Sequence, residues 1–473
     1  MKHPPSQRRL RRREFVQAAG RAALAAAASL PGCAHAREAR PDGRPNVVVI
    51  FIDDMGYGDI EPFGSTLNRT PHLNRMAEEG VKLTSFYVAA PLCTPSRAAL
   101  MTGCYPKRVG LARGSWGGVL FPKDSHGLHP NEVTIAEVLG KAGYATGCFG
   151  KWHLGDQPAF LPTRHGFDTY FGIPYSNDMW PKHPGAKRWK HGVCPLPVMR
   201  GKKVVDVVED MDDQAQLCKR FTDEAVTFIR KNEDKPFFVY LPHAFIHWPR
   251  QARQAFMDKA GGDATRAQIE EVDWSVGQIL QTLRDLDPAQ NTLVLFTSDN
   301  GGSRGCVNKP LRGGKGNTWE GGMREPTLAW WPGHVPAGAV CDEVASTMDL
   351  LPTVARLAGG KAPDDRVIDG KDIAPLLRDP ANAKSPHETF FYHQGNNLRA
   401  VRAGKWKLHA NGGLYDLDAD IGEQKNVAKQ HPDVVKRLRG YLAECRKDLG
   451  NPKNCRPVGT CQNPQYLVPK ETG

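Results

Sequence analysis

The chain has 473 residues, 40% hydrophobic and 24% charged, an ordinary composition for a globular protein that excludes collagen, coiled-coil and wholly disordered classes. No apolar run of about 20 residues follows the N-terminal region, so we expect no transmembrane span in the mature chain. The net charge of +12 is partly local, because residues 1–36 contain seven Lys or Arg and one acid, which leaves +6 for the remainder. No later basic block is interleaved with aromatic residues, and we therefore expect no nucleic-acid partner.

The first 36 residues have the pattern of an export signal: a basic stretch, an Ala-rich stretch at 22–30 and a small-residue cleavage site, Ala-His-Ala, at 34–36. The sequence Arg-Arg-Glu-Phe at 12–15 resembles a twin-arginine (Tat) signal, which implies the Tat export machinery as a partner and a periplasmic or secreted location. Cys33 ends a lipoprotein-like sequence, Leu-Pro-Gly-Cys, and a lipid anchor there is an alternative, although the proline departs from the usual pattern. A basic amphipathic helix is disfavoured because the Ala-rich stretch has no polar face.

Four apolar, β-rich runs alternate with helical patterns in the next part of the chain. The runs do not alternate polar and apolar residues, which is typical of strands buried on both faces. They predict an α/β sheet with helices on both sides, and polar groups that follow such strands collect at one edge of the sheet. The strands are expected at 47–52, 144–149, 237–241 and 293–296, and the helices at 134–142, 213–231 and 265–286.

The pattern changes after about residue 380. Residues 389–393 and 398–408 predict antiparallel strands with a turn near Gly404, a short strand is expected at 414–415, and residues 432–447 predict an amphipathic helix. We therefore expect a catalytic α/β domain at 45–380 and a smaller α+β domain with an antiparallel sheet and a tail at 381–473.

Cys93 is placed by its neighbours at the start of a helix. Thr94 suits the N-cap, Pro95 the first helical position and Gly103 the end. Free backbone N–H groups at a helix start favour an anion, and Arg97 lies one turn further on. The alternative is an ordinary buried cysteine ahead of a helix.

Oxygen-bearing side chains follow two of the predicted strands. Asp53 and Asp54 come after the first, and Asp299 and Asn300 after the last. Any one of these residues could be a simple turn residue, but three carboxylates in one place would repel each other without a cation. An all-oxygen set favours a hard cation such as Ca²⁺ over Zn²⁺.

These segments together resemble the sulfatase family, of the arylsulfatase A-like type. Cys-Thr-Pro-Ser-Arg at 93–97, followed by Ala-Ala-Leu-Met-Thr-Gly, matches the sulfatase signature C-x-P-S-R. Further matching segments occur in order at 53–59 (DDMGYGD), 150–155 (GKWHLG), 247–249 (HWP), 298–302 (SDNGG) and 314–322 (GKGNTWEGG), and the similarity extends over roughly residues 45–430 to LYDL at 414–417 with Glu423 and Asn426 beyond. The resemblance implies an alkaline phosphatase-like fold, with a large, mixed, mostly parallel sheet between helices.

The resemblance also implies the cofactors. In this family a formylglycine-generating enzyme oxidises the signature cysteine, here Cys93, to formylglycine (3-oxoalanine). Asp53, Asp54, Asp299 and Asn300 would hold Ca²⁺ with the modified Cys93 as a further ligand. One hydroxyl of the hydrated aldehyde would attack sulfur to give a covalent sulfated intermediate, with Asp299 as the base. A second hydroxyl provides a route for releasing sulfate that a serine lacks.

The remaining roles follow by position. Arg97 and Lys151 would orient the hydrated aldehyde. Lys151, His247 and Lys315 would bind the sulfate oxygens, and fixed cations aimed at developing charge are usually the largest catalytic contribution. Either His247 or Lys315 would protonate the departing alcohol. His153 would take a proton from the second hydroxyl so that sulfate is expelled.

Two other functions remain open. A phosphoester or phosphonate hydrolase of the alkaline phosphatase superfamily would share the core, although those enzymes mostly carry Ser or Thr at position 93. A non-catalytic binder of sulfated glycans would keep the fold without turnover. The expected substrate is a sulfate monoester, either a sulfated carbohydrate or an aryl sulfate. Loops at 115–130 and 175–201 would set specificity, and His243 is expected to flank the pocket. Trp180 is expected on a surface loop, with a place at the border of the substrate pocket as the alternative.

Overall fold

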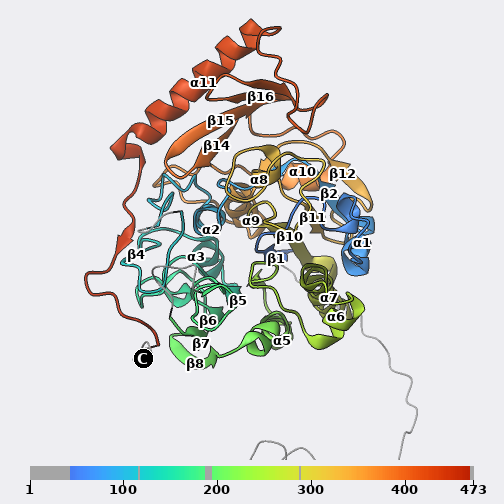
Figure 1. Ribbon diagram of the computed structural model, residues 1–473, viewed down its shortest axis with the longest axis vertical. Coiled ribbons are helices and arrows are strands. Elements are labelled where there is room, and N and C mark those ends of the chain that lie inside the picture. The colour runs from blue at the N-terminus through green and yellow to red at the C-terminus, as the bar shows by residue number, and fades with distance from the viewer. Residues whose placement is uncertain (1–42, 115–117, 187–193, 287–288, 469–473) are drawn as a thin grey trace, which may run out of the picture. The chain divides into compact units, whose positions relative to one another are not determined.

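The computed structural model describes residues 43–114, 118–186, 194–286 and 289–468, and the predicted export signal with Cys33 lies outside them. A ten-stranded sheet forms its centre, in the order β12-β2-β11-β10-β1-β9-β5-β6-β7-β8 (Figure 1). The strands β10, β1, β9, β5 and β6 are parallel neighbours, and the flanking strands add antiparallel pairs. The sheet is thus mixed and mostly parallel, as expected. Its strands are β1 (Asn46–Ile52), β2 (Val81–Leu83), β5 (Ala145–Lys151), β6 (Thr169–Ile173), β7 (Leu196–Arg200), β8 (Lys203–Val208), β9 (Phe237–Pro242), β10 (Thr292–Ser298), β11 (Thr327–Trp330) and β12 (Ala339–Cys341).

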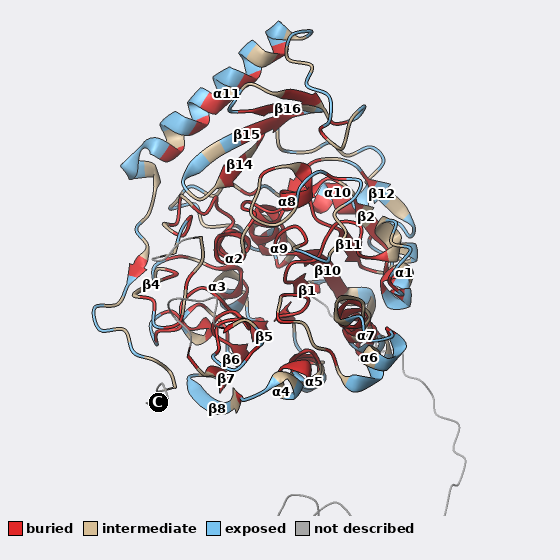
Figure 2. Ribbon diagram, in the orientation of Figure 1, coloured by how far each residue is buried: buried red, intermediate tan, exposed pale blue. Residues whose placement is uncertain are grey.

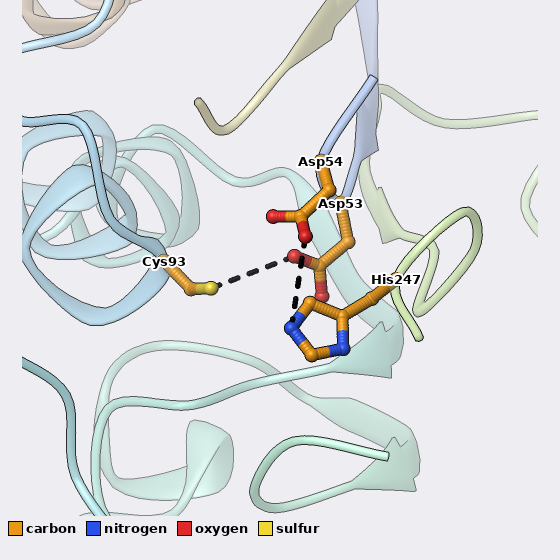
Figure 3. Close-up of side chains that lie close together, drawn as sticks. All are labelled: Asp53, Asp54, Cys93 and His247. Atoms are coloured by element: carbon orange, nitrogen blue, oxygen red, sulfur yellow. Dashed lines mark hydrogen bonds and ion pairs between the residues drawn. The ribbon is translucent and has the colours of Figure 1, made fainter. Parts of the chain in front are cut away.

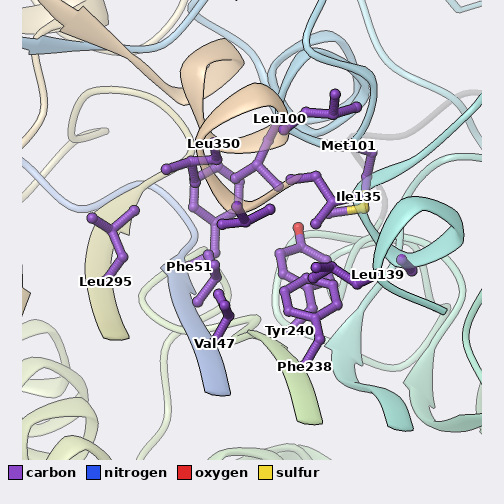
Figure 4. Close-up of a cluster of buried hydrophobic side chains, with 14 of the residues drawn as sticks. Val47, Phe51, Leu100, Met101, Ile135, Leu139, Phe238, Tyr240, Leu295 and Leu350 are labelled. Atoms are coloured by element: carbon purple, nitrogen blue, oxygen red, sulfur yellow. The ribbon is translucent and has the colours of Figure 1, made fainter. Parts of the chain in front are cut away.

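Helices cover both faces of this sheet. Successive side chains of each central strand point to opposite faces, and because both sets are apolar, each face has to be covered. In β1, Val47, Val49 and Phe51 pack with one group of helices (Figure 4), whereas the three residues between and after them pack with the other. The first group includes α2 (Cys93–Thr102), α3 (Ile135–Lys141), α9 (Leu350–Leu357) and α10 (Ala374–Arg378), and the second includes α1 (Pro71–Glu78), α5 (Leu217–Lys231) and α7 (Ala264–Asp285). The non-alternating apolar runs of the sequence are therefore strands buried on both faces (Figure 2).

Some boundaries differ from the prediction. The helix expected at 213–231 is two helices, α4 (Met211–Ala215) and α5, with Gln216 between them. The other short elements are α6 (Gln254–Lys259), α8 (Glu320–Met323), β3 (Phe86–Tyr87) paired with β13 (Ala345–Ser346), and β4 (His126–Gly127). Within the part of the chain that the structure describes, no helix is both long enough and apolar enough to cross a membrane.

The C-terminal part forms a second, smaller sheet. Its antiparallel strands β14 (Phe390–Gln394), β15 (Asn397–Ala403), β16 (Trp406–His409) and β17 (Leu414–Asp416) follow one another in space as in the sequence. The stretch predicted at 398–408 is split by a turn at Gly404, whose φ of 55° suits glycine. The helix α11 (Pro432–Gly450) covers this sheet through Val434, Leu438 and Leu442. The tail then returns to the larger domain, where β18 (Gly459–Thr460) pairs with β4.

Candidate active site

The predicted site residues lie at one edge of the large sheet. Asp53 and Asp54 follow β1, Lys151 ends β5, His247 lies beyond β9, and Asp299 and Asn300 follow β10. These four strands are adjacent and parallel, so their carboxyl ends meet at the same edge. Figure 3 shows Cys93, at the start of α2, facing Asp53, Asp54 and His247.

The helix that carries Cys93 starts earlier than predicted. It begins at Cys93 itself with Leu92 as the N-cap, so the expected cap at Thr94 is wrong. The hydroxyl of Thr94 instead donates a hydrogen bond to the carbonyl oxygen of His153 (3.1 Å) and accepts one from the N–H of Leu120 (3.1 Å). A side chain that bonds to two neighbouring loops cannot cap its own helix. Thr94 therefore anchors the start of α2 between the loops that carry His153 and Leu120.

The four predicted oxygen ligands converge with Cys93. The Sγ atom of Cys93 lies 3.5 Å from Oδ1 of Asp53, and the amide Nδ2 of Asn300 donates to Oδ1 of Asp54 at 2.8 Å. The N–H of Asp54 donates to Oδ1 of Asp299 at 3.2 Å. Asp54 has a φ of 65°, a left-handed conformation that Asp tolerates better than most residues.

Two buried cations and one partly exposed cation hold these carboxylates. The guanidinium of Arg97 donates two hydrogen bonds to Oδ2 of Asp299 (3.0 and 2.8 Å) and a third to the carbonyl oxygen of Lys151 (2.8 Å). The ammonium of Lys151 pairs with Asp53. The ammonium of Lys315 lies 2.7 Å from Asp54 and 3.7 Å from Sγ of Cys93. The cluster therefore has fixed positive charge on both sides of residue 93.

The oxygen set fits a calcium ion. Burial opposes ionisation of Asp53 and Asp54, but the surrounding positive groups, led by Lys151 at Asp53 and by Lys315 at Asp54, together outweigh it and lower both pKa values. Burial and the charge of Asp53 raise the pKa of Asp299 to about 7, a shift that a nearby cation would oppose. The Oδ1 atom of Asn300 is buried without a hydrogen-bond partner among the described residues. Ionised carboxylates and an unpartnered amide oxygen are the donors that Ca²⁺ prefers.

Cys93 as a thiol is unsuited to nucleophilic attack. The side chain is only 2% exposed, and burial together with the negative charge of Asp53 raises the pKa of the thiol far above its usual range. The thiolate is the nucleophilic form of cysteine, and it is absent at neutral pH under these conditions. An ionised cysteine is therefore disfavoured at this position.

The histidines differ in their hydrogen bonds. Ring atom Nε2 of His153 is 2.9 Å from the carbonyl oxygen of Leu120, while Nδ1 is buried without a partner among the described residues. Nδ1 of His247 lies 2.6 Å from the carbonyl oxygen of Trp248, and its Nε2 lies 3.7 Å from Asp54. Burial first and a nearby lysine second lower the pKa of both rings, so each is neutral near pH 7. His243 lies deeper and bonds to Ser275 (2.9 Å).

The smaller sheet holds the loop that carries Lys315. The carboxylate of Glu423 accepts hydrogen bonds from the N–H of Glu320 (2.7 Å) and from His409 (2.9 Å). Lys407 on β16 donates to the carbonyl oxygen of Thr318 (2.8 Å) and pairs with Glu320 (2.9 Å) and Glu423 (3.0 Å). The side chains of Lys407, Glu320 and Glu423 are completely buried. The sequence showed Glu423 as part of a motif without indicating that it supports the active-site loop.

Two features near the site were missed or misplaced by the sequence. The hydroxyl of Ser176 accepts a hydrogen bond from the ammonium of Lys151 (3.0 Å), and no pattern distinguishes this serine from its neighbours. Trp180, expected on a surface loop, is 1% exposed, because its ring packs in the core and its N–H donates to Gln214 (3.1 Å). The segment from Ser176 to Trp180 is thus part of the folded wall beside Lys151.

A helix-borne residue facing carboxylates at the ends of parallel strands, on a sheet of this order, defines a hydrolase of the alkaline phosphatase superfamily. Residues 45–360 match the family model described as Sulfatase, and residues 314–448 match that of the C-terminal region of N-sulphoglucosamine sulphohydrolase. The chain therefore belongs to the sulfatase family, and its activity is the hydrolysis of sulfate esters.

Known sulfatases resemble the chain over most of its length. It is 38% identical to arylsulfatase A of Homo sapiens over 85% of this chain and 87% of that protein. It is 41% identical to N-acetylgalactosamine-6-sulfatase of Rattus norvegicus over 77% of this chain and 71% of that protein. The solved structure of Ps i-CgsB in complex with k-i-k-neocarrahexaose is 31% identical, with a TM-score of 0.75 over 85% of this chain and 92% of that one.

Proposed function

We propose that the protein is a Ca²⁺-dependent sulfatase that uses formylglycine made from Cys93 to hydrolyse a sulfate monoester of a carbohydrate. The observation that carries this proposal is the buried cluster in which ligand atoms of Asp53, Asp54, Cys93 and His247 all lie within 4.8 Å of one another. Calcium would neutralise negative charge on the sulfate, and a hydrated formylglycine would supply one hydroxyl for attack and a second whose ionisation releases sulfate.

The chain's own residues orient and stabilise these groups. Asp299 is positioned by the two hydrogen bonds from Arg97 to accept a proton beside residue 93. Lys151 and Lys315 are held by Asp53 and Asp54 on either side of Cys93 and would bind sulfate oxygens. Fixed charges of this kind stabilise the charge that develops during ester cleavage without reorganising.

The hydrogen bonds favour Lys315 over His247 as the proton donor to the departing alcohol. A carbonyl oxygen can only accept, so Nδ1 of His247 carries the proton that it donates to Trp248. The neutral ring then has no proton on Nε2, the atom that faces Asp54. Burial opposes protonation of Lys315, but its negative neighbours, led by Asp54, together outweigh burial and raise the pKa of Lys315, so the ammonium keeps a proton to give.

His153 suits the acceptance of a proton during sulfate release. The carbonyl oxygen of Leu120 fixes the proton on Nε2, which leaves the unpartnered Nδ1 as the basic atom. Thr94 links the backbone of His153 to α2, so the ring and residue 93 are carried by connected elements.

The substrate class rests on the relatives. Two of them are named for sulfated-sugar hydrolysis or bound to a carrahexaose, which supports a sulfated carbohydrate, and arylsulfatase A supports aryl sulfates as reporter substrates. The predicted Tat signal supports export to the periplasm or beyond, after maturation by a formylglycine-generating enzyme.

The test combines activity with mass spectrometry. The wild type, expressed with a formylglycine-generating enzyme, is expected to show the mass of formylglycine in the peptide containing residue 93 and to hydrolyse an aryl sulfate in preference to an aryl phosphate. Cys93→Ala is expected to retain the fold, checked by circular dichroism, and to lose turnover. Substantial sulfate release by that variant would overturn the assignment of residue 93 as the nucleophile. A preference of the wild type for the aryl phosphate would favour the phosphoesterase alternative.

A further inference from the structure

A cationic pocket lies outside the catalytic cluster, between the loop that follows α2 and the C-terminal domain. It has a volume of about 360 Å³ and is bordered by that loop, the β14–β15 hairpin and the C-terminal half of α11. Lys107, Arg399 and Arg446 line it, one from each of these elements, and none of its lining residues is an Asp or Glu. The pocket therefore combines three positive charges from segments far apart in the sequence.

These charges are free to meet a ligand. No ion pair or hydrogen bond of the Lys107 or Arg446 side chain occurs in the described ranges, and Arg399 uses only its Nε, which donates to Gln394 (3.1 Å). The nearby carboxylates are already engaged, because Asp369 and Asp448 each lie 2.7 Å from the guanidinium of Arg108. An anion entering the pocket would not have to displace an internal partner.

Neutral polar groups complete the lining. Asn396 and Asn397 supply amide groups, and His393 borders the pocket with its Nδ1 buried and unpartnered among the described residues. Burial and the charge of Lys107 lower the pKa of His393 to about 3, so this ring is neutral near pH 7. A mixture of amides and cations is suited to a group that is both charged and hydroxylated, such as an anionic sugar.

The pocket is connected to the active-site loop. The amide of Gln394 accepts from Arg399 and donates to the carbonyl oxygen of Gly316 (2.5 Å), the residue after Lys315. Two hydrogen bonds and one amide group therefore join Nε of Arg399 to this carbonyl, a path of about 8 Å. A polymer bound at Lys315 could extend a neighbouring charged sugar toward Arg399.

We propose that this pocket binds a second anionic group, a sulfate or carboxylate, of a polysaccharide chain whose sulfate ester lies at Cys93. The proposal rests on the proposed function and makes its substrate a polyanionic chain rather than an isolated sulfate ester. Exposed charges act over about 8 Å at physiological ionic strength, so this contribution weakens with added salt.

The test separates binding at the pocket from catalysis. The parent protein for this test carries Cys93→Ala, which prevents turnover. Its binding is measured as retardation in native gels that contain carrageenan or dextran sulfate. Gels that contain uncharged dextran serve as the neutral control. The pocket variant adds Arg399→Ala and Arg446→Ala. The control adds Lys436→Ala and Lys447→Ala, which remove two exposed charges of α11 that do not line the pocket.

We expect the pocket variant to bind the sulfated polymers about tenfold more weakly, the control to bind within about twofold of the parent, and dextran to retard neither. With Cys93 restored, the pocket variant should hydrolyse a small aryl sulfate normally. The proposal that the pocket binds an anionic group would be overturned if the pocket variant and the control bound the sulfated polymers equally well, or if the sulfated polymers did not retard the parent. Failure of the wild type to hydrolyse the aryl sulfate would instead refute the proposed function.

Discussion

Two lysines, one on β16 and one in the turn that precedes it, provide a matched test of how the smaller sheet supports the active site. Lys407 is completely buried, pairs with Glu320 (2.9 Å) and Glu423 (3.0 Å), and bonds to the carbonyl oxygen of Thr318. Lys405 forms one ion pair, 2.7 Å from Asp416, and its side chain is 44% exposed. The same substitution, Lys→Met, removes the charge from each.

Lys407→Met leaves two buried carboxylates without their shared cation. Breaking a buried ion pair by removing one partner costs about 3–5 kcal/mol, and we expect a loss of that size in the free energy of unfolding. Lys405→Met breaks a pair that water and salt already screen, and we expect no measurable change. Lys407→Met also removes the hydrogen bond to the carbonyl oxygen of Thr318, three residues from Lys315. The Lys315 loop then loses a support, so kcat/KM should fall about tenfold even where the variant is folded.

Urea unfolding followed by tryptophan fluorescence measures the stability of the two variants, and aryl sulfate hydrolysis in the absence of urea measures kcat/KM. If Lys407→Met unfolds at the same urea concentration as Lys405→Met, the buried network contributes no net stability. If it loses stability but keeps full kcat/KM, the smaller sheet does not position Lys315.

Ser176→Ala removes the hydrogen bond to Lys151 (3.0 Å), and a loss of about 1 kcal/mol lowers kcat/KM for an aryl sulfate about fivefold; an unchanged value would show that the ion pair alone holds Lys151. Burial opposes ionisation of Glu320, but the charges of Lys407, Arg324 and Arg402 together outweigh it and lower the pKa of Glu320. The stability that this carboxylate contributes is therefore present above its unfolded pKa of about 4.5 and is lost as the pH falls further. Urea titrations from about pH 5 to about pH 3 should therefore show a shallower loss in Glu320→Gln, and equal slopes would contradict this. Chelation by EDTA should lower the thermal midpoint of the wild type and affect Asp54→Asn less, whereas no shift in the wild type would refute a calcium site.

The main features of the sheet were predictable because buried parallel strands leave a local signal. The apolar runs ending at Ile52 and Phe296 locate two strands, and the aspartates that follow must then share an edge. The boundaries of the helices were harder to predict. Thr94 is a residue type that often caps a helix, and only the three-dimensional fold places the N–H of Leu120 and the carbonyl oxygen of His153 beside its hydroxyl.

The support of the site was not predictable from sequence. Lys407 and Glu320 are 87 residues apart, and neither periodicity nor turn chemistry links a strand of the smaller sheet to the first residue of α8. The same holds for Arg399 and Lys107, whose common pocket depends on how the β14–β15 hairpin meets the loop after α2. Such pairs depend on tertiary packing rather than on local preference.

The enclosure of Cys93 constrains the timing of maturation. Under the proposed chemistry a second protein must reach the sulfur of Cys93, yet in the folded chain this residue is 2% exposed. In that case, oxidation would have to precede folding of the chain around α2. The strands that hold the Lys315 loop lie at residues 390–416, so they are synthesised long after Cys93, and residue 93 would stay accessible until they form. A copy that folds too early would be trapped with its thiol and would stay inactive however much enzyme arrived later.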